Sequence, residues 1–384
     1  MNLFRLARIR RNFSASHVIS AVAVSAFAIV GFASESLADT YVITDLGAPG
    51  VSSAGYAINN LGQVAGAVYP TGCCNALPTV WSNPGSTTLG SLPGLQNGLP
   101  QGINSSGQIA GYSFGNAGQV ATVWNGATPT ALQYLAGTNV SNGVGINNAG
   151  QVAGTSYNGS VTASFATLWN GTIPTALGQL SGTTHSSGSA INNLGQVAGS
   201  TSIGDTSSVA TVWTGGLPTA LAFLPGTTSG SALGINDAGL VVGGTIDASG
   251  NSLATLWNAV GPVSLGTLSG GLSSVAFAIN NLGDIVGSSN DRAGGTFATL
   301  WTGSTIVNLG ALPGGKNSVA RGINDLGQIV GYSQDANGES HSVLWTLSPV
   351  VAVPLGTSNW PMTLLGVVTI AFATYRRRTS GAAR

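Results

Sequence analysis

The sequence predicts an all-β fold, a seven-bladed β-propeller built from repeats of about 44 residues. Two independent markers recur every 43 to 45 residues along the chain. The first is an Ile-Asn pair, whose asparagines are Asn59, Asn104, Asn147, Asn192, Asn236, Asn280 and Asn324. The second is a tryptophan, which stands at Trp81, Trp124, Trp169, Trp213, Trp257, Trp301 and Trp345. The two counts agree and indicate seven units.

The segment 273–314 shows the internal plan of one unit. Its β-type runs, separated by turn residues, predict strands at 275–279, 284–288, 297–301 and 305–312. In most units Asn-Asn-x-Gly or Asn-Asp-x-Gly follows the first run, and the early Asn and late Gly are typical of a hairpin turn. Four strands in about 44 residues match one propeller blade, whereas solenoid coils are usually shorter.

The two ends of the repeat region predict how the ring closes. Residues 41–50 parallel residues 305–314, the fourth strand of a unit, yet they precede any first strand. The seventh unit reaches Trp345 and lacks the Leu-Gly-x-Leu-Pro-Gly sequence that should follow. The N-terminal strand is therefore expected to complete the last blade, which leaves no terminal unit with an unpaired edge. The alternative is that residues 350–353 supply this fourth strand.

The N-terminal segment 1–38 is typical of a cleaved signal peptide. A basic stretch precedes the apolar run 18–32, and small residues stand three and one before a cut between Ala38 and Asp39. The residues 10–13, Arg-Arg-Asn-Phe, also resemble the core of a twin-arginine export signal, so two export routes stay open.

The C-terminal segments predict a membrane helix. The repeat domain at 39–348 is followed by a linker at 349–359, an uncharged apolar stretch at 360–375 and a basic tail at 376–384. Positive residues after a hydrophobic helix hold that end in the cytoplasm. Sixteen residues are fewer than the usual span of about 20, although residues 350–355 could extend the stretch. The membrane is thus an expected partner of the unprocessed chain.

This C-terminal pattern resembles the PEP-CTERM class of bacterial sorting signals. The matching residues are Val353, Pro354, Leu355, Trp360, Leu364, Leu365, Gly366, Tyr375, Arg376, Arg377 and Arg378. The resemblance implies processing by an exosortase-type membrane protease for display at the surface. The chain has Leu355-Gly356 where the family has the Glu and second Pro of its motif. A plain membrane anchor is the alternative interpretation.

The repeats at 41–345 resemble the HAF extracellular repeat family. That family places Gly-Ile-Asn-x-x-Gly-Gln-Val-x-Gly before a His-Ala-Phe triplet, and Leu-Gly-x-Leu-x-Gly after it. Residues 322–331 and 309–314 match the flanking elements, whereas His341 alone matches the His of the triplet. The resemblance implies an exported repeat protein and no particular ligand.

Composition excludes nucleic acid as a partner. Only 6% of the residues are charged, and between Asp39 and Glu339 three cations face ten acids, a net charge of −7. Binding to nucleic acid requires clustered Lys and Arg that neutralise phosphates.

Catalytic groups are sparse, so we expect no enzyme and no cofactor. His185 stands in a turn-like region and His341 before a strand, with no evident partner, and no Gly-x-Ser-x-Gly elbow occurs. Asp237 and Asp325 could form a glycosidase pair, but they share a repeat position that holds Asn or Ser in other units. A structural turn explains that exchange better.

The remaining candidates also have structural explanations. Residues 335–339, Asp-Ala-Asn-Gly-Glu, space their oxygen ligands somewhat like a calcium loop, but a hairpin turn fits better and no metal site is assigned. The seven tryptophans are expected to pack between blades rather than stack on sugars. Cys73 and Cys74 are adjacent, so a disulfide between them would be strained and no redox role follows.

These sequence features leave three functions open. The first is a binding or matrix module, exported to the bacterial cell envelope or surface or released, that contacts extracellular polysaccharide or an envelope protein. The second is a glycan-active hydrolase or lyase, with Asp205, Asp247 and Asp291 converging at one face of the ring. The third is a purely structural coat protein.

Overall fold

A computed structural model describes residues 41–47, 50–70, 75–83, 85–159, 163–202 and 207–348. All of them belong to one compact unit, Asp39–Arg384. The predicted signal peptide with its cut between Ala38 and Asp39, the linker, the apolar stretch and the basic tail lie outside these ranges. So do Cys73, Cys74 and Asp205.

Within these ranges every regular element is a strand. No helix in the described part of the chain is long and apolar enough to cross a membrane. The apolar stretch 360–375 is not among the residues on which this finding rests.

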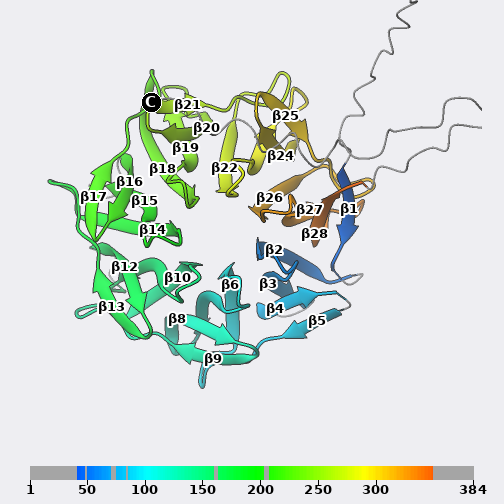
Figure 1. Ribbon diagram of the computed structural model, residues 1–384. Coiled ribbons are helices and arrows are strands. Elements are labelled where there is room, and N and C mark those ends of the chain that lie inside the picture. Colours follow the sequence, from blue (N-terminus) through cyan, green and yellow to red (C-terminus); the bar gives the residue numbers. More distant parts are fainter. Residues whose placement is uncertain are drawn as a thin grey trace, which may run out of the picture. The chain divides into compact units, whose positions relative to one another are not determined.

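The first six sequence repeats form four strands each and the seventh forms three, and the sheets are arranged around a central opening (Figure 1). The first strands are nearest to this opening: β2 (Ser52–Ile58), β6 (Asn97–Ile103), β10 (Val140–Ile146), β14 (His185–Ile191), β18 (Thr227–Ile235), β22 (Ser274–Ile279) and β26 (Ser318–Ile323). The second strands follow the asparagine turn: β3 (Val64–Tyr69), β7 (Ile109–Gly115), β11 (Val152–Tyr157), β15 (Val197–Ser202), β19 (Val241–Asp247), β23 (Ile285–Asn290) and β27 (Ile329–Gln334).

The third strands carry the tryptophans: β4 (Leu77–Ser82), β8 (Gly118–Asn125), β12 (Ser164–Asn170), β16 (Ser208–Thr214), β20 (Ser252–Asn258), β24 (Thr296–Thr302) and β28 (Ser340–Leu347). The fourth strands are short and largely exposed: β5 (Gly85–Thr88), β9 (Thr128–Ala131), β13 (Ile173–Ala176), β17 (Leu217–Ala220), β21 (Gly261–Ser264) and β25 (Thr305–Asn308).

The sequence-based prediction made this fourth strand too long. It placed the strand at 305–312, but β25 ends at Asn308. Gly310 has a φ of 75°, a left-handed conformation that turns the chain away from the sheet. Leu309 and Leu312 then enter the core, where they are 6% and 8% exposed. Leu309 still donates its backbone N–H to Ala298 of β24, and the side chains of both leucines pack in the core from the loop that follows the strand.

Strands that are consecutive in a unit pair antiparallel, which gives five four-stranded sheets and one of eight strands. In the larger sheet, β12 and β14 of two neighbouring units meet through the single pair Ser164 and His185. The sheet that holds the last unit has the order β1-β28-β27-β26, where β1 is Tyr41–Asp45. In this sheet β28 has β1 on one side and β27 on the other, so both its edges are paired. Residues 350–353, the alternative fourth strand, lie outside the described residues.

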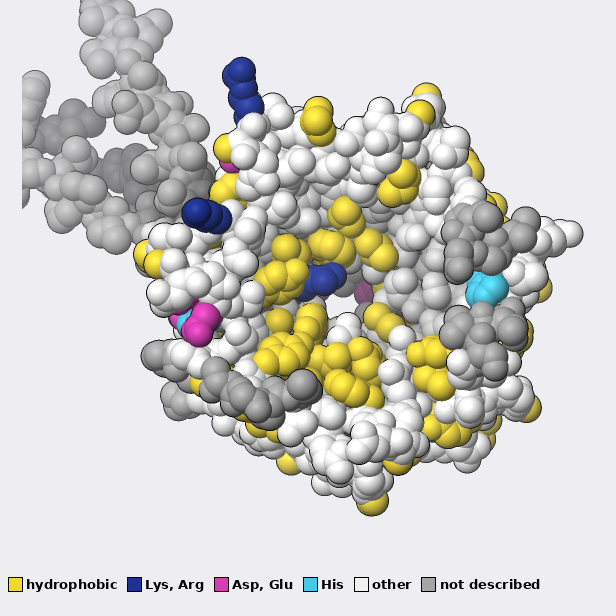
Figure 2. Space-filling model, turned by 180° about the vertical axis from the view of Figure 1, so that it is seen from behind, with side chains coloured by type: hydrophobic (Ala, Val, Ile, Leu, Met, Phe, Trp, Pro, Cys, Tyr) yellow, Lys and Arg dark blue, Asp and Glu magenta, His cyan; other side chains and the backbone are white. Residues whose placement is uncertain are grey.

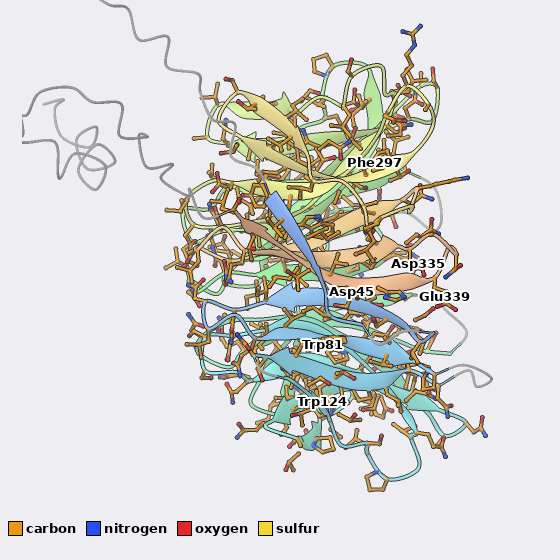
Figure 3. All side chains as sticks on the ribbon, turned by 90° about the vertical axis from the view of Figure 1, so that its right-hand side faces the viewer. Asp45, Trp81, Trp124, Phe297, Asp335 and Glu339 are labelled. Carbon is orange, nitrogen blue, oxygen red and sulfur yellow. The ribbon has the colours of Figure 1, made fainter. Side chains whose placement is uncertain are left out.

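The tryptophans pack between neighbouring units. All seven are buried, with exposed fractions of 0% to 7%, and Trp81 and Trp124 are labelled in Figure 3. Several indole N–H groups donate to a backbone carbonyl of the preceding unit, as Trp124 does to Gly90 at 2.8 Å and Trp213 to Gly178 at 2.6 Å. A large ring that is buried and fixed by one hydrogen bond sets the spacing between two sheets.

An asparagine ring connects the units at their inner edge. In every unit the Ile-Asn asparagine is 3% to 5% exposed, and its Nδ2 donates to the backbone carbonyl of the next unit's asparagine at 2.9 to 3.2 Å. The last of these bonds runs from Asn324 to Asn59. The same side chain also holds its own turn, since Asn192 Oδ1 accepts from the N–H groups of Leu194 and Gln196. The turn was predicted from the sequence, but the hydrogen bond between units was not.

Replacing one ring asparagine should destabilise the whole domain. Asn192→Ala leaves two turn N–H groups without their partner and removes one of the two hydrogen bonds to the Asn236 carbonyl, which keeps the bond from the Gly239 N–H. We therefore expect a loss of about 2–4 kcal/mol in the free energy of unfolding. Urea denaturation followed by tryptophan fluorescence measures this loss. Leu194→Ala is the control in the same turn, because Leu194 is 71% exposed and its removal should change stability by less than about 0.5 kcal/mol. Equal urea midpoints for Asn192→Ala and the parent would contradict the role of the ring.

Candidate functional site

The first strands surround a central channel with two different mouths. Seven isoleucines line both cavities and form the wall between them: Ile58, Ile103, Ile146, Ile191, Ile235, Ile279 and Ile323. On one side, a cavity of about 240 Å³ is lined by the asparagine ring and the residues that follow it in the turns. On the other side, a cavity of about 350 Å³ is lined by the residues that precede the isoleucines. We call these the turn mouth and the bulge mouth.

The bulge mouth takes its name from an irregularity in every first strand. In each unit the pairing between the first and second strands skips the residue two positions before the isoleucine. A β-bulge of this kind adds one residue to a strand and re-aims its side chain. The skipped residues all line the cavity, and we call them the bulge ring: Tyr56, Gln101, Val144, Ser189, Leu233, Phe277 and Arg321.

A repeated glycine makes the bulge possible. A Cβ atom on Gly154 would overlap the carbonyl oxygen of Asn142 on the opposite strand, and the equivalent glycine meets the equivalent carbonyl in every other unit. These glycines are Gly66, Gly111, Gly154, Gly199, Gly243, Gly287 and Gly331. The Val-x-Gly element that recurs along the sequence is therefore required by close backbone approach beside the bulge.

The bulge ring varies while its surroundings repeat. The residue after each member is only Ala or Gly, and the next is always Ile, yet the ring members differ in size, polarity and charge. All seven are half-buried, so their side chains are reachable from the channel. These residues were not among the predicted site residues, although the seven repeats aligned with one another show a variable position here.

Aromatic and cationic groups gather in one arc of the bulge mouth. The guanidinium of Arg321 lies 4.4 Å from the centre of the Phe277 ring and 5.9 Å from that of Tyr332. In the next unit the hydroxyl of Tyr56 hydrogen-bonds the hydroxyl of Tyr69 at 2.7 Å. Figure 2 shows hydrophobic side chains around the opening with one basic group among them. Arg321 is the one charged residue that lines this mouth in the described part of the chain.

Burial keeps the nearby phenols protonated. Burial, together with the hydrogen bond between Tyr69 and Tyr56, raises the pKa of Tyr69 far above its ordinary value, and burial also raises that of Tyr112. Tyr112 packs against Phe114, with ring centres 5.8 Å apart. These hydroxyls therefore stay neutral hydrogen-bonding groups over the physiological pH range.

The turn mouth is polar and carries the two aspartates that sequence analysis weighed as a glycosidase pair. Asp237 Oδ1 accepts from the backbone N–H of Asn193 at 2.8 Å, and Asp325 Oδ1 accepts from that of Asn281 at 2.8 Å. Asp325 Oδ2 also accepts from the side chain of Asn60 at 3.2 Å. Both carboxylates thus link neighbouring turns, in the same way as the Asn side chains at equivalent positions. Among the described residues, Arg321 lines the bulge mouth, and Asp237 and Asp325 line the turn mouth.

The acids proposed to converge for glycan cleavage occupy separate hairpins between second and third strands. Asp247 ends β19, and its carboxylate accepts from the N–H groups of Ser249 and Asn251. Asp291 holds the next hairpin in the same way, through the N–H groups of Ala293 and Gly295. Each carboxylate accepts hydrogen bonds within its own turn. Stabilisation of the turn therefore explains the presence of an aspartate at both positions.

Both histidines among the described residues lie in strands. His185 begins β14, and its Nδ1 lies 2.9 Å from the hydroxyl of Thr184, so its assignment to a turn was wrong. His341 lies in β28 rather than before a strand and is 5% exposed. Its Nδ1 lies 2.8 Å from Asp45 Oδ2 in β1, a partner that the sequence did not reveal because the two residues are 296 positions apart.

The calcium-like loop at 335–339 is a hairpin turn between β27 and β28. Asp335 Oδ1 accepts from the N–H groups of Asn337 and Glu339. Partial burial of the Asp335 carboxyl acts to raise its pKa. The hydrogen bonds from these N–H groups and from the Asn337 amide, together with the nearby His341, have the larger effect, so the pKa lies below its ordinary value. One carboxylate oxygen each from Asp335 and Glu339 and one ring nitrogen of His341 all lie within 4.8 Å of one another.

Comparison with known proteins identifies the fold. The sequence matches no protein-family model and no curated protein. The β-propeller domain of the Trilobed protease from Pyrococcus furiosus superposes with a TM-score of 0.53 at 9% identity, covering 80% of this chain and 93% of that one. A puromycin-hydrolyzing peptidase from Mycobacterium tuberculosis gives 0.55 at 11% identity, covering 80% and 54%. The described part of the chain is a β-propeller.

A third similar structure is TolB from Acinetobacter baumannii, with a TM-score of 0.40 at 13% identity and coverage of 57% of this chain and 52% of that one. The chain thus spans about half the length of TolB and of the peptidase. At these identities the likeness concerns the fold alone. The predicted propeller architecture is confirmed at this level.

The aspartate turns should lose part of their stability in acid. The Asn251 side chain and the turn N–H groups lower the pKa of Asp247 below its ordinary value of 3.8, so its contribution is present above that value and is lost as the pH falls through the lowered pKa. Asp247→Asn keeps the hydrogen-bond acceptor and removes the charge. We expect its thermal midpoint to lie below that of the parent at pH 7 and to approach it at pH 2.5. Ser249→Ala, in the same turn, should give a difference that does not change with pH, and a constant difference for Asp247→Asn would contradict this assignment.

Proposed function

We propose that this chain is an exported, surface-associated and non-catalytic binding module that holds an acidic saccharide in the bulge mouth. The observation that carries the proposal is the bulge ring. Seven equivalent positions on a repeated frame aim seven different side chains into one cavity of about 350 Å³. This volume lies at the lower end of the range for small-ligand sites, about 300 to 1,000 Å³, and suits the terminal residue of a polysaccharide.

The chemistry of the ring favours an acidic sugar. The guanidinium of Arg321 can form paired hydrogen bonds with a carboxylate, and no acidic residue of the described chain lines this mouth to compete for it. Phe277 and Tyr56 stand in the neighbouring units on either side and offer flat apolar surface to a sugar ring. Gln101 and Ser189 add hydrogen-bonding groups on the rest of the ring.

A non-catalytic role is proposed because the weighed carboxylates have turn partners. Asp237 and Asp325 accept from the turns of adjacent units, and Asp247 and Asp291 accept from their own turns. Glycoside hydrolysis requires two carboxyl groups that flank the scissile bond at a fixed separation. Carboxylates engaged with backbone N–H groups in separate turns support a binding role over cleavage.

We also propose that the seven repeats are seven blades and that β1 closes the ring. Two contacts support this closure. β1 pairs with β28 over five residues, from Tyr41 with Leu347 to Asp45 with Val343. The side chain of Asn324 donates to the carbonyl of Asn59 at 2.9 Å, as each earlier ring asparagine does to its successor.

Export and surface display belong to the same proposal. They rest on the signal-peptide pattern before Asp39, the apolar stretch 360–375 and the Arg376–Arg378 run. The resemblance to HAF repeats and to PEP-CTERM signals adds the expectation of a bacterial envelope location and an exosortase-type protease as a processing partner. Extracellular polysaccharide is the proposed ligand.

Arg321→Ala tests the site. The full chain, kept in mild detergent, is titrated calorimetrically with trigalacturonate and, in parallel, with the neutral maltotriose. We expect the acidic sugar to bind more tightly and Arg321→Ala to weaken it at least tenfold, or about 1.4 kcal/mol, because the carboxylate loses its cation. Lys316→Ala is the matched control, since Lys316 is an exposed cation that does not line the mouth.

Three results would count against the proposed site. They are equal binding of trigalacturonate by the parent and Arg321→Ala, failure of the parent to bind at millimolar ligand, and an equal effect of Lys316→Ala. Release of reducing ends from trigalacturonate by the parent chain would instead favour the glycan-active alternative.

Mass spectrometry of the protein isolated from its producing cells tests export. We expect the mature chain to begin at Asp39, because signal peptidase cuts after small residues such as Ala38. Under the sorting hypothesis the peptides containing residues 360–384 are absent, whereas a plain anchor retains them. A mature chain that begins at Met1 would exclude the proposed signal peptide.

A further inference from the structure

The hairpin between β27 and β28 differs in chemistry from its equivalents. Three positions of this hairpin hold Asp335, Glu339 and His341. In the preceding unit the same positions hold Asp291, Gly295 and Phe297. In the unit before that they hold Asp247, Asn251 and Leu253. Figure 3 shows Asp335 and Glu339 at the edge of the last sheet near Asp45, with Phe297 in the neighbouring sheet. The equivalent hairpins form without a Glu and a His at these positions, so the turn itself does not require Glu339 or His341.

The side chain of His341 is held in one orientation. It is 5% exposed, and its Nδ1 lies 2.8 Å from Asp45 Oδ2, while Asp45 Oδ1 accepts from the N–H of Gly47 at 2.8 Å. A side chain at position 47 would crowd the imidazole, because a Cβ there would lie 3.2 Å from Nδ1. An ionised carboxylate only accepts hydrogen bonds, so Nδ1 carries a proton toward Asp45, and Nε2 is the ring nitrogen whose lone pair can bind a metal ion.

This lone pair faces the acidic hairpin. Nε2 has no hydrogen-bond partner among the described residues and lies 4.0 Å from Glu339 Oε2. The ligand atoms of His341, Glu339 and Asp335 are all within 4.8 Å of one another. A buried nitrogen lone pair aimed at two carboxylates leaves a polar atom unsatisfied unless a cation or donor stands between them.

We propose that Asp335, Glu339 and His341 bind a divalent transition-metal ion of the zinc class, with Asp45 as the positioning residue. One imidazole and two carboxylates suit Zn²⁺, whereas Ca²⁺ and Mg²⁺ take oxygen ligands. The Asp45 carboxylate on the far ring nitrogen is the outer contact that metal-bound histidines usually make. Three protein ligands leave a coordination position for water.

The three ligand atoms need to move only slightly closer together to bind zinc. Tetrahedral zinc with bonds of about 2.0 to 2.2 Å places its ligand atoms roughly 3.3 to 3.5 Å apart. The observed separations of up to 4.8 Å reach this with sub-ångström to ångström movements of Asp335 and Glu339, which are only partly buried. Their exposure also gives the ion a path from solvent.

The site would fasten the two ends of the repeat region to each other. Its ligands lie on the β27–β28 hairpin, and the residue that positions His341 lies on β1, the first strand of the domain. A bound ion therefore stabilises the pairing of β1 with β28. This inference is independent of the saccharide site, which lies in the central channel.

Zinc titration of the untagged, EDTA-stripped full chain tests the inference. Calorimetry with ZnCl₂ should give one ion per chain, and thermal unfolding should shift upward with added zinc because only the folded chain holds the site. Glu339→Gln should raise the dissociation constant at least about tenfold, and Asp45→Asn by about 10- to 100-fold. His341→Gln should abolish saturable binding and remove the imidazole signal from the zinc X-ray absorption spectrum.

Asp291→Asn is the matched control, since Asp291 holds the equivalent hairpin without the Glu and His, and it should leave zinc affinity unchanged. Circular dichroism checks that each variant is folded, and Glu339→Gln keeps the test decisive if a change at buried His341 disrupts the sheet. The inference fails if the parent shows no saturable zinc binding, if Glu339→Gln binds as tightly as the parent, or if Asp291→Asn weakens binding equally. Saturation by calcium but not zinc would also overturn it.

Discussion

Hydrogen bonds from asparagine side chains to the next unit's backbone are the interaction on which the rest of the structure depends. Each ring asparagine fixes its own turn through Oδ1 and reaches the neighbouring asparagine carbonyl through Nδ2. Because both groups are buried, the turn is fully satisfied only when the adjacent unit is in place. The tryptophans repeat this arrangement further out, with each ring packed against the preceding unit. A unit on its own would lose the asparagine hydrogen bond and the tryptophan packing between units. This dependence on neighbours explains why the repeats are so regular.

This regular frame leaves function to the residues that do not repeat. Inside the channel, the bulge in each first strand and the glycine beside it are constant, so the skipped residue can vary without structural cost. Arg321, Phe277 and Tyr56 stand at such positions, and the proposed binding site is built on them. At the edge of the last sheet, Glu339 and His341 are likewise exceptions on a hairpin that other units build without them. In both places an exception to the repeat coincides with a cavity or an unpaired buried atom.

Much of the fold could be predicted from the sequence because its signals are local and occur seven times. Strand periodicity, the Asn-to-Gly turn and the buried tryptophan recur in each unit, and the strands of the segment 273–314 agree with the structure to within one residue or two in three of four cases. The fourth strand was predicted too long because Leu309 and Leu312 are apolar, and apolar character alone does not distinguish a paired strand from a buried loop. The bulge ring was missed because a bulge is a property of pairing between two strands, which a single strand's pattern does not record.

The sequence by itself determined the number of repeats, the four-strand plan of each and the segments expected to direct export, because these depend on spacing and on runs of one residue type. Only the tertiary structure decided that the turn asparagines join neighbouring units, that seven different side chains meet in one mouth of the channel, and that Asp45 meets His341. The physical reason is distance along the chain. Asp45 and His341 are 296 residues apart, and the pairing of β1 with β28 brings Asp45 Oδ2 to 2.8 Å from His341 Nδ1. The repeat pattern predicts that pairing but does not show which side chains meet across it.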